Sequence, residues 1–188
     1  MKRAIVMGAS SGIGHEVARL LIMQGWTVGV AARRKEKLDL KNCAPERVFT
    51  AQIDVTNEKA DEALSQLADQ IGGLDLYFHA AGIGWKNPTL EPEKEMKTMQ
   101  TNGLGFVRMV GEAYRYFATH GGGHIVCITS VAGTKGIGAI PAYSATKAMQ
   151  NTYLQALEQL AANNHLNIRF TDIRPGFVDT PLLPDSSH

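Results

Sequence analysis

Tyr143 and Lys147, in the sequence YSATK, are separated by four positions. On a helix this spacing places both side chains on one face. A phenol has a reference pKa of about 10, too high for efficient proton exchange at neutral pH, and a nearby ammonium lowers it. The pair therefore suggests proton transfer, although a Tyr and a Lys at this spacing also occur together by chance.

A third polar residue, Ser130, ends the apolar run HIVCITS, thirteen residues before Tyr143. Ligands of open α/β sheets bind in the crevice outside the carboxyl ends of the strands. A hydroxyl at the end of this run is therefore expected to reach the crevice that Tyr143 and Lys147 line.

The elements that must position these residues alternate between short apolar runs and longer helical patterns. The runs are rich in branched apolar residues without clean alternation, as in strands buried on both faces. Strands are expected at 3–8, 27–32, 47–54, 74–82, 124–130 and 166–176. Helices are expected along the apolar stripes Ile13, Val17, Leu20, Leu21 and Ala60, Leu64, Leu67, Ala68, Ile71, from Pro92 to about His120, and from about Ala142 to Asn164.

This alternation predicts an α/β fold over residues 1–188. The expected architecture is one domain with a doubly wound, mainly parallel sheet and helices on both faces, the Rossmann fold. The length suits a single core, and no internal repeat or linker interrupts the pattern.

A glycine-rich loop, GASSGIG, joins the first strand to the first helix. Glycines allow a tight turn and close backbone approach, and free amides at a helix start hold a pyrophosphate. The loop predicts dinucleotide binding, with a plain strand-to-helix connection as the alternative. The residues expected to bind are Gly8, Ser10, Ser11, Gly12, Ile13 and Gly14.

The second strand is followed by Arg33 and Arg34 rather than by an acidic residue. An Asp or Glu about 20 residues beyond the glycines binds a free ribose hydroxyl, whereas a guanidinium grips a phosphate. NADP(H) is therefore preferred and NAD(H) is possible, unless the arginines are only a solvated charge cluster. Asp54 and Val55, in DVT, end the third strand where an adenine edge can bind, with a turn or cap carboxylate as the alternative for Asp54.

The overall composition excludes several partner classes. Nineteen basic and eighteen acidic residues leave a net charge of +1, so no global field attracts nucleic acid or an anionic membrane. The sequence has no membrane-length apolar run and no signal-peptide core, so a cytoplasmic location is expected. Cys43 and Cys127 are far apart and share no motif, so neither a disulfide framework nor a metal site is predicted.

Together these motifs resemble the short-chain dehydrogenase/reductase family. They follow the family's order and approximate spacing over essentially the whole chain: GASSGIG, DVT, AAG at Ala80 to Gly82, Asn102 in QTNGLGF, Ser130 in CITS, YSATK, and RPGFVDT at Arg174 to Thr180. The resemblance implies an oxidoreductase that interconverts a carbonyl and an alcohol.

The resemblance also implies residue roles. Tyr143 would be the general acid or base, Ser130 would hold the substrate oxygen, and Lys147 would bind the nicotinamide ribose and lower the Tyr143 pKa. Asn102 would help arrange a water that links Lys147 to solvent. Besides Tyr143 and Lys147, the cofactor site would gain Ala80, Ala81, Gly82, Pro175, Gly176, Val178 and Thr180. Taken alone, Asn102 is an ordinary helical polar residue and Thr180 a turn hydroxyl.

Two departures from the family pattern keep alternatives open. His79 stands where the family usually has Asn; a structural histidine is expected there rather than a new catalytic one. The sequence also ends where family members commonly continue, which suggests that the usual C-terminal segment is lacking. A non-catalytic NADP(H)-binding sensor or scaffold is therefore the second hypothesis, and a structural interaction protein is the third.

The two long helices carry more apolar positions than a sheet-facing stripe needs. A homodimer or homotetramer through these helices is therefore expected, with a small-molecule substrate as the other partner. The sequence does not specify the substrate, because specificity resides in the loops.

Overall fold

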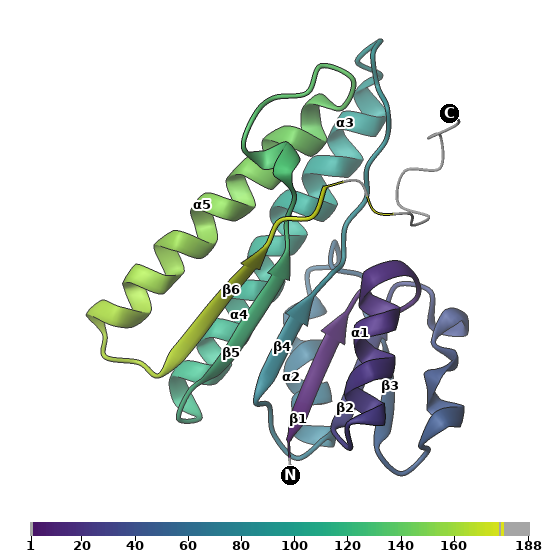
Figure 1. Ribbon diagram of the computed structural model, residues 1–188, viewed down its shortest axis with the longest axis vertical. Coiled ribbons are helices and arrows are strands. Elements are labelled where there is room, and N and C mark those ends of the chain that lie inside the picture. The colour runs from purple at the N-terminus through teal and green to yellow at the C-terminus, as the bar shows by residue number, and fades with distance from the viewer. Residues whose placement is uncertain (1, 177, 179–188) are drawn as a thin grey trace.

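The structure, a computed structural model, describes residues 2–176 and 178. Within these residues, six parallel strands form one sheet in the order β3-β2-β1-β4-β5-β6 (Figure 1). The strand order reverses between β1 and β4, as in a doubly wound sheet. The strands are β1 (Arg3–Met7), β2 (Thr27–Ala32), β3 (Val48–Gln52), β4 (Leu76–His79), β5 (Gly123–Ile128) and β6 (Ile168–Ile173).

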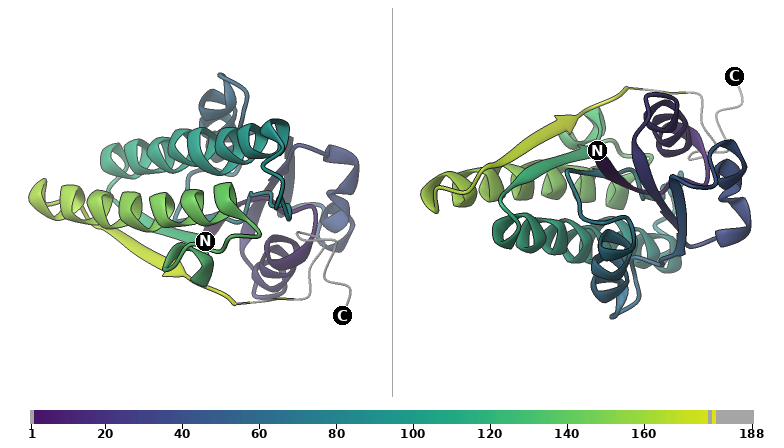
Figure 2. Two further views of the ribbon diagram at one scale, coloured as in Figure 1. Left: turned by 90° about the horizontal axis from the view of Figure 1, so that it is seen from above. Right: turned by 90° about the horizontal axis from the view of Figure 1, so that it is seen from below.

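Helices cover both faces of the sheet, which confirms the predicted fold class. They are α1 (Gly12–Met23), α2 (Ala60–Gln70), α3 (Pro92–Thr98), α4 (Phe106–Thr119) and α5 (Pro141–Asn163). Helix α1 lies on one face, and α2, α4 and α5 lie on the other, with α4 and α5 side by side (Figure 2). None of the described helices has the length and apolar character that crossing a membrane requires.

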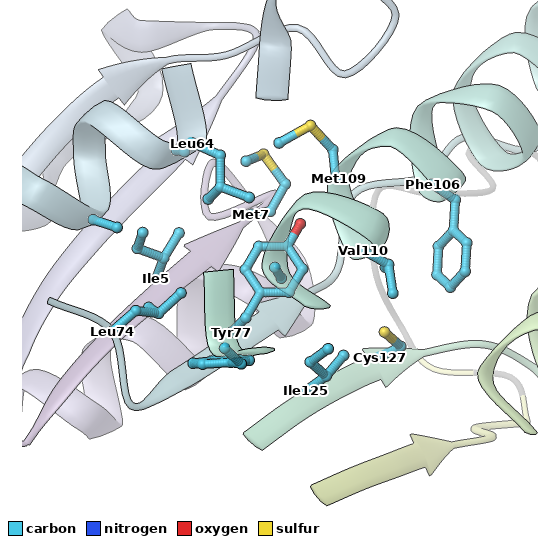
Figure 3. Close-up of a cluster of buried hydrophobic side chains, with 14 of the residues drawn as sticks. Ile5, Met7, Leu64, Leu74, Tyr77, Phe106, Met109, Val110, Ile125 and Cys127 are labelled. Atoms are coloured by element: carbon cyan, nitrogen blue, oxygen red, sulfur yellow. The ribbon is translucent and has the colours of Figure 1, made fainter. Parts of the chain in front are cut away.

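Alternate residues of the central strands enter two separate cores. Ile5 and Tyr77 pack with α2 and α4, whereas their neighbours Val6 and Phe78 pack on the α1 side. Figure 3 shows Tyr77 among the residues of the larger core, with Met109 nearby. Strands buried on both faces in this way explain why the sequence shows apolar runs instead of alternation.

The prediction of which α1 side chains are buried is partly wrong. Leu20 is 43% exposed, and the buried line instead passes through Gly14, Ala18 and Ile22. These positions are four apart and begin with two small residues, so the helix axis can approach β1 closely. The larger side chains of the stripe therefore lie on the flanks of the helix. The stripe expected on α2 is fully buried, as predicted.

The long helix expected from Pro92 to about His120 has a different internal geometry. Between α3 and α4 the chain forms a π-helical segment, Met99–Gly105. Such segments are rare and occur frequently at functional sites. This one contains Asn102, so the departure from α-helical geometry falls on a residue that the sequence had singled out.

Candidate active site

A groove of about 350 Å³ opens at the carboxyl ends of the strands. Its walls come from the segments that follow β1, β2, β3 and β4, so it lies at the point where the strand order reverses. Thirteen residues predicted to bind the cofactor line it: Gly8, Ser10, Ser11, Gly12, Ile13, Gly14, Arg33, Arg34, Asp54, Val55, Ala80, Ala81 and Gly82.

The floor of the groove depends on two glycines. A Cβ on Gly8 would lie 2.6 Å from the backbone nitrogen of Ala81, and one on Gly14 would lie 2.3 Å from the carbonyl oxygen of Gly8. Gly8 also has a φ of 90°, which L side chains rarely adopt. The end of β1, the start of α1 and the segment after β4 are thus in backbone contact.

The first turn of α1 is suited to an anion. Its N-cap residue, Ser11, is extended, and the hydroxyl makes no capping hydrogen bond to the helix. No acidic side chain lies in this turn. Because the first amides of a helix have no backbone partner and carry a partial positive charge, this turn fits a pyrophosphate.

Arg33 and Arg34 follow β2 at the rim of the groove, and both are exposed. Within the described part of the chain neither guanidinium makes an ion pair or a side-chain hydrogen bond. The carbonyl of Arg33 accepts a hydrogen bond from Nε2 of Gln52 at 3.1 Å, which fixes the backbone beside β3. Both guanidinium groups are therefore available to an anionic ligand.

Asp54 has a structural partner inside its own turn. Its Oδ1 accepts hydrogen bonds from the backbone nitrogen and the hydroxyl of Thr56, at 3.0 and 2.7 Å. The turn-carboxylate interpretation of Asp54 is thus correct, although the residue also lines the groove. The carbonyl of Val55 accepts a hydrogen bond from Nη1 of Arg108 at 2.8 Å, which ties this turn to α4.

Ser130, Tyr143 and Lys147 converge beside the groove. The hydroxyl oxygen of Ser130 accepts a hydrogen bond from the backbone nitrogen of Ala132 at 3.0 Å, and this side chain lies close enough to Tyr143 to lower its pKa. Nζ of Lys147 lies 5.5 Å from the centre of the Tyr143 ring. It donates a hydrogen bond at 3.0 Å to the carbonyl of Ile128, a residue that lines the groove.

Burial dominates the protonation of this cluster. It raises the pKa of Tyr143, and the hydrogen bond from Ser130 opposes the rise. It lowers the pKa of Lys147 to about 8, and Cys127 and Asp172 oppose the fall. Burial disfavours both charged forms and outweighs the other contributions to the Tyr143 pKa, so the expectation that Lys147 lowers this pKa stays a prediction.

Asn102 lies in the π-helical segment and is fully buried. Its Nδ2 donates to the carbonyl of Ile83 at 2.7 Å, and its Oδ1 accepts from the Ile83 nitrogen at 2.9 Å. A Cβ on Gly82 would lie 3.4 Å from this Oδ1 and 3.9 Å from Nζ of Lys147. Asn102 thus fixes the segment after β4 beside the Lys147 ammonium.

The sequence matches the family model described as short chain dehydrogenase over residues 2–188. The chain belongs to the short-chain dehydrogenase family. It is accordingly an oxidoreductase that acts on CH–OH groups of small molecules with a nicotinamide cofactor.

Relatives and solved structures agree with this assignment. An uncharacterized oxidoreductase of Mycobacterium tuberculosis (strain ATCC 25618 / H37Rv) is 32% identical over 99% of this chain and 77% of its own. An uncharacterized oxidoreductase of Staphylococcus aureus (strain MW2) is 33% identical over 96% of this chain and 80% of its own. A short-chain dehydrogenase from Streptomyces avermitilis superposes with a TM-score of 0.87 at 29% identity, covering 96% of this chain and 67% of its own. An actinorhodin polyketide ketoreductase with NADPH superposes with a TM-score of 0.85 at 28% identity, covering 96% of this chain and 72% of its own.

Three other residues predicted to bind the cofactor lie on the segment after β6. Pro175, Gly176 and Val178 follow β6, and none of them is among the residues that line the groove. The carbonyl of Pro175 accepts a hydrogen bond from the backbone nitrogen of Val131 at 3.2 Å, next to Ser130. Thr180 lies outside the described residues.

Sequence reasoning missed several residues at the site. Ile83, Gly84, Trp85, Thr101 and Ile128 also line the groove. Ile83, Gly84 and Trp85 follow β4, Ile128 ends β5, and Thr101 precedes Asn102, so their positions in the sequence could have indicated that they lie at the groove. Gln150 was missed too: its Nε2 donates at 2.8 Å to the carbonyl of Asn102, a contact that depends on the π-helical backbone.

His79 is a buried structural residue of this dehydrogenase, 1% exposed. Its Nδ1 lies 2.8 Å from the Tyr77 hydroxyl, and its ring packs edge-on against Phe106. Burial, aided by the charge of Lys147, lowers the His79 pKa to about 3. The imidazole is therefore neutral at physiological pH, and its Nε2 has no hydrogen-bond partner.

The His79 pKa predicts a specific acid sensitivity. Between pH 6.5 and 3 the unfolded chain binds a proton that the folded chain excludes, so the free energy of unfolding falls as the pH falls. From pH 7 to pH 5, wild type should lose about 2 kcal/mol more than His79→Asn, measured by urea unfolding. The control His165→Asn, at an exposed position, should lose as much as wild type. Equal losses in wild type and His79→Asn would refute the assignment.

Proposed function

We propose that this chain is an NADP(H)-dependent oxidoreductase that interconverts a carbonyl and an alcohol, with Tyr143 as general acid and base. The observation that carries the proposal is the convergence of Ser130, Tyr143 and Lys147 at the edge of a groove suited to a dinucleotide. Ser130 follows β5, and Tyr143 and Lys147 lie on α5.

Each side chain has a distinct role in the proposed reaction. The nicotinamide, when bound, supplies or accepts the hydride. Tyr143 donates its proton to the carbonyl oxygen during reduction and removes it from the alcohol during oxidation. Ser130 donates a hydrogen bond to the same oxygen and stabilises the developing alkoxide.

Protonation states at neutral pH favour this assignment. The phenol of Tyr143 is protonated at neutral pH, as a general acid for carbonyl reduction requires, although burial raises its pKa away from the value that suits proton transfer best. Lys147, with a pKa of about 8, holds its proton below that pH and can bind the ribose hydroxyls as an ammonium. Through its hydrogen bonds to Ile83, Asn102 fixes the position of the segment after β4. In this position the segment leaves space for the Lys147 side chain.

The proposed binding position of the cofactor lies along the same groove. The loop from Gly8 to Gly14 would hold the pyrophosphate, and Asp54 and Val55 would border the adenine. The segments at Ala80 to Gly82 and at 175–180 would border the nicotinamide. Two structural neighbours support the NADP(H) class: the ketoreductase solved with NADPH and an alcohol dehydrogenase from Thermococcus sibiricus complexed with 5-hydroxy-NADP, 26% identical at a TM-score of 0.84 and covering 95% of this chain and 77% of its own.

The assembly is proposed to be a homodimer or homotetramer through the long helices. Apolar side chains remain exposed along their outer faces: Met96, Met99, Leu104, Val107 and Leu160. A second copy packed on this face would bury these side chains, and burial of apolar surface is favourable.

Replacing the phenol tests the catalytic assignment. Tyr143→Phe should retain NADPH binding, measured by fluorescence, and lose nearly all NADPH consumption across a panel of aldehydes and ketones. The matched control Tyr153→Phe, on the same helix, should keep wild-type turnover. Full activity in Tyr143→Phe would overturn the assignment. Tight NADPH binding by wild type with no consumption across the panel would favour the sensor or scaffold instead.

Removing the two arginines tests cofactor selectivity. Hydrogen bonds to charged groups contribute about 1.5–3 kcal/mol, so the double variant Arg33→Gln/Arg34→Gln should bind NADPH at least about tenfold more weakly. Its affinity for NADH should stay near that of wild type, because NADH has no ribose phosphate. Arg169→Gln, on β6, is the control and should bind both cofactors normally. An unchanged NADPH affinity in the double variant contradicts the NADP(H) preference.

A charge on the helix face tests the assembly. Leu104 is 67% exposed, so Leu104→Glu should leave the fold intact and shift the mass measured by light scattering toward monomer at micromolar concentration. Met23 on α1 is 70% exposed, and Met23→Glu should leave the assembly unchanged. Wild type that is strictly monomeric at this concentration excludes the proposed assembly.

A further inference from the structure

Asp172, on β6, joins three segments around the proposed catalytic cluster. Its Oδ1 accepts a hydrogen bond from the hydroxyl of Thr129, the residue before Ser130. Its Oδ2 accepts one from Nε of Arg174 at 2.6 Å, immediately before Pro175. The carboxylate therefore connects the end of β5 with the segment that leaves β6.

Asn151 connects the same carboxylate to α5. Oriented so that its amide nitrogen faces acceptors, Asn151 lies 2.9 Å from the Thr129 hydroxyl, 3.2 Å from Oδ2 of Asp172 and 3.3 Å from the carbonyl of Lys147. The Thr129 hydroxyl can accept from Asn151 and donate to Asp172 at once, so the chain of hydrogen bonds is consistent.

This polar network lies in a tightly packed position. Thr129 is buried, and its backbone nitrogen donates to the carbonyl of Ile173 at 2.8 Å. A Cβ on Gly133 would lie 2.7 Å from the side-chain amide of Asn151. Little room remains for the end of β5 to move relative to α5, so the position of Ser130 relative to Tyr143 depends on this network.

Asp172 also provides charge close to Lys147, which is 4% exposed. The side chains that interact with or border this ammonium come from His79 on β4, Cys127 on β5, Asp172 on β6, Tyr143 on α5 and Asn102 in the π-helical segment. His79 is neutral above a pKa of about 3, burial raises the pKa of both Cys127 and Tyr143, and Asn102 does not titrate.

Within this set, Asp172 is thus the one side chain with a carboxyl group. Arg174 offsets part of that charge, because it binds the same carboxylate from an exposed position.

We propose that Asp172 is a positioning residue for the proposed reaction: it locks Ser130, α5 and the Arg174 segment together and places a fixed negative charge near Lys147. The inference rests on the proposed function of Ser130, Tyr143 and Lys147. It adds a residue from β6 that touches neither the groove nor the proposed substrate oxygen.

Titration of Lys147 tests the charge directly and requires no turnover. The protein is labelled with ¹³C at the lysine Cε atoms, and the Lys147 signal is assigned by its loss in Lys147→Met. In Asp172→Asn the midpoint of this signal should fall by about one pH unit, because removing a nearby anion disfavours the ammonium. Thr129→Val removes a hydrogen bond and keeps the carboxylate, so its midpoint should stay within about 0.3 unit of wild type.

A midpoint in Asp172→Asn that equals that of wild type overturns the proposal. If the Asn variant does not fold, Asp172→Ser also removes the charge and is measured with the same expectation. A residue that only stabilised the fold would lower the melting temperature and leave the Lys147 midpoint unchanged.

Turnover separates this inference from the proposed function. With the panel substrates that wild type reduces, Asp172→Asn should lower kcat about tenfold while its NADPH affinity stays within twofold of wild type. As the pH rises, kcat of Asp172→Asn should begin to decline at a lower pH than kcat of wild type, because Lys147 loses its proton at a lower pH in this variant. Full activity in Tyr143→Phe would refute the proposed function, yet the Lys147 titration would still decide whether Asp172 supplies the charge.

Discussion

The close approach of β1, α1 and the segment after β4 is the constraint on which the groove depends. No side chain fits at Gly8 or Gly14, because a Cβ at either position would overlap backbone atoms of a neighbouring segment. The contact leaves the first turn of α1 open at the carboxyl edge of the sheet, where helix amides can meet an anion. Larger residues at these two positions would separate the strand from the helix and close the dinucleotide site.

Desolvation controls the chemistry at the other end of the groove. Lys147 and Tyr143 are both buried, and burial moves each toward its neutral form. The opposing contributions are specific: the hydrogen bond from Ser130 acts on Tyr143, and the charge of Asp172 acts on Lys147. The protonation of Ser130, Tyr143 and Lys147 as a group therefore depends on residues outside the groove, including Asp172 on β6.

Sequence reasoning anticipated the fold, because apolar runs, helical patterns and the glycine loop are local properties. It also anticipated the half of the groove formed by Gly8 to Gly14, Arg33, Arg34 and Asp54. It did not anticipate the π-helical segment, since that backbone depends on tertiary contacts such as the bond from Gln150 to Asn102. The burial that raises the Tyr143 pKa was not anticipated for a related reason: a four-residue spacing reports which face a side chain occupies and not how much water it loses. Asp172 carries no motif, and only the folded sheet brings it close to Lys147. Asn151 lies one helical turn after Lys147 on α5, but its contacts with Asp172 and Thr129 also depend on the folded sheet.

The central claim is that a dinucleotide bound along the groove presents its nicotinamide to Tyr143. A crystal structure of this chain with NADP⁺ tests it most directly. The account predicts the ribose phosphate against Arg33 and Arg34, the pyrophosphate on the first turn of α1, and the nicotinamide ribose within hydrogen-bonding distance of Lys147 and Tyr143. A cofactor bound outside the groove, or a nicotinamide turned away from Tyr143, would contradict it.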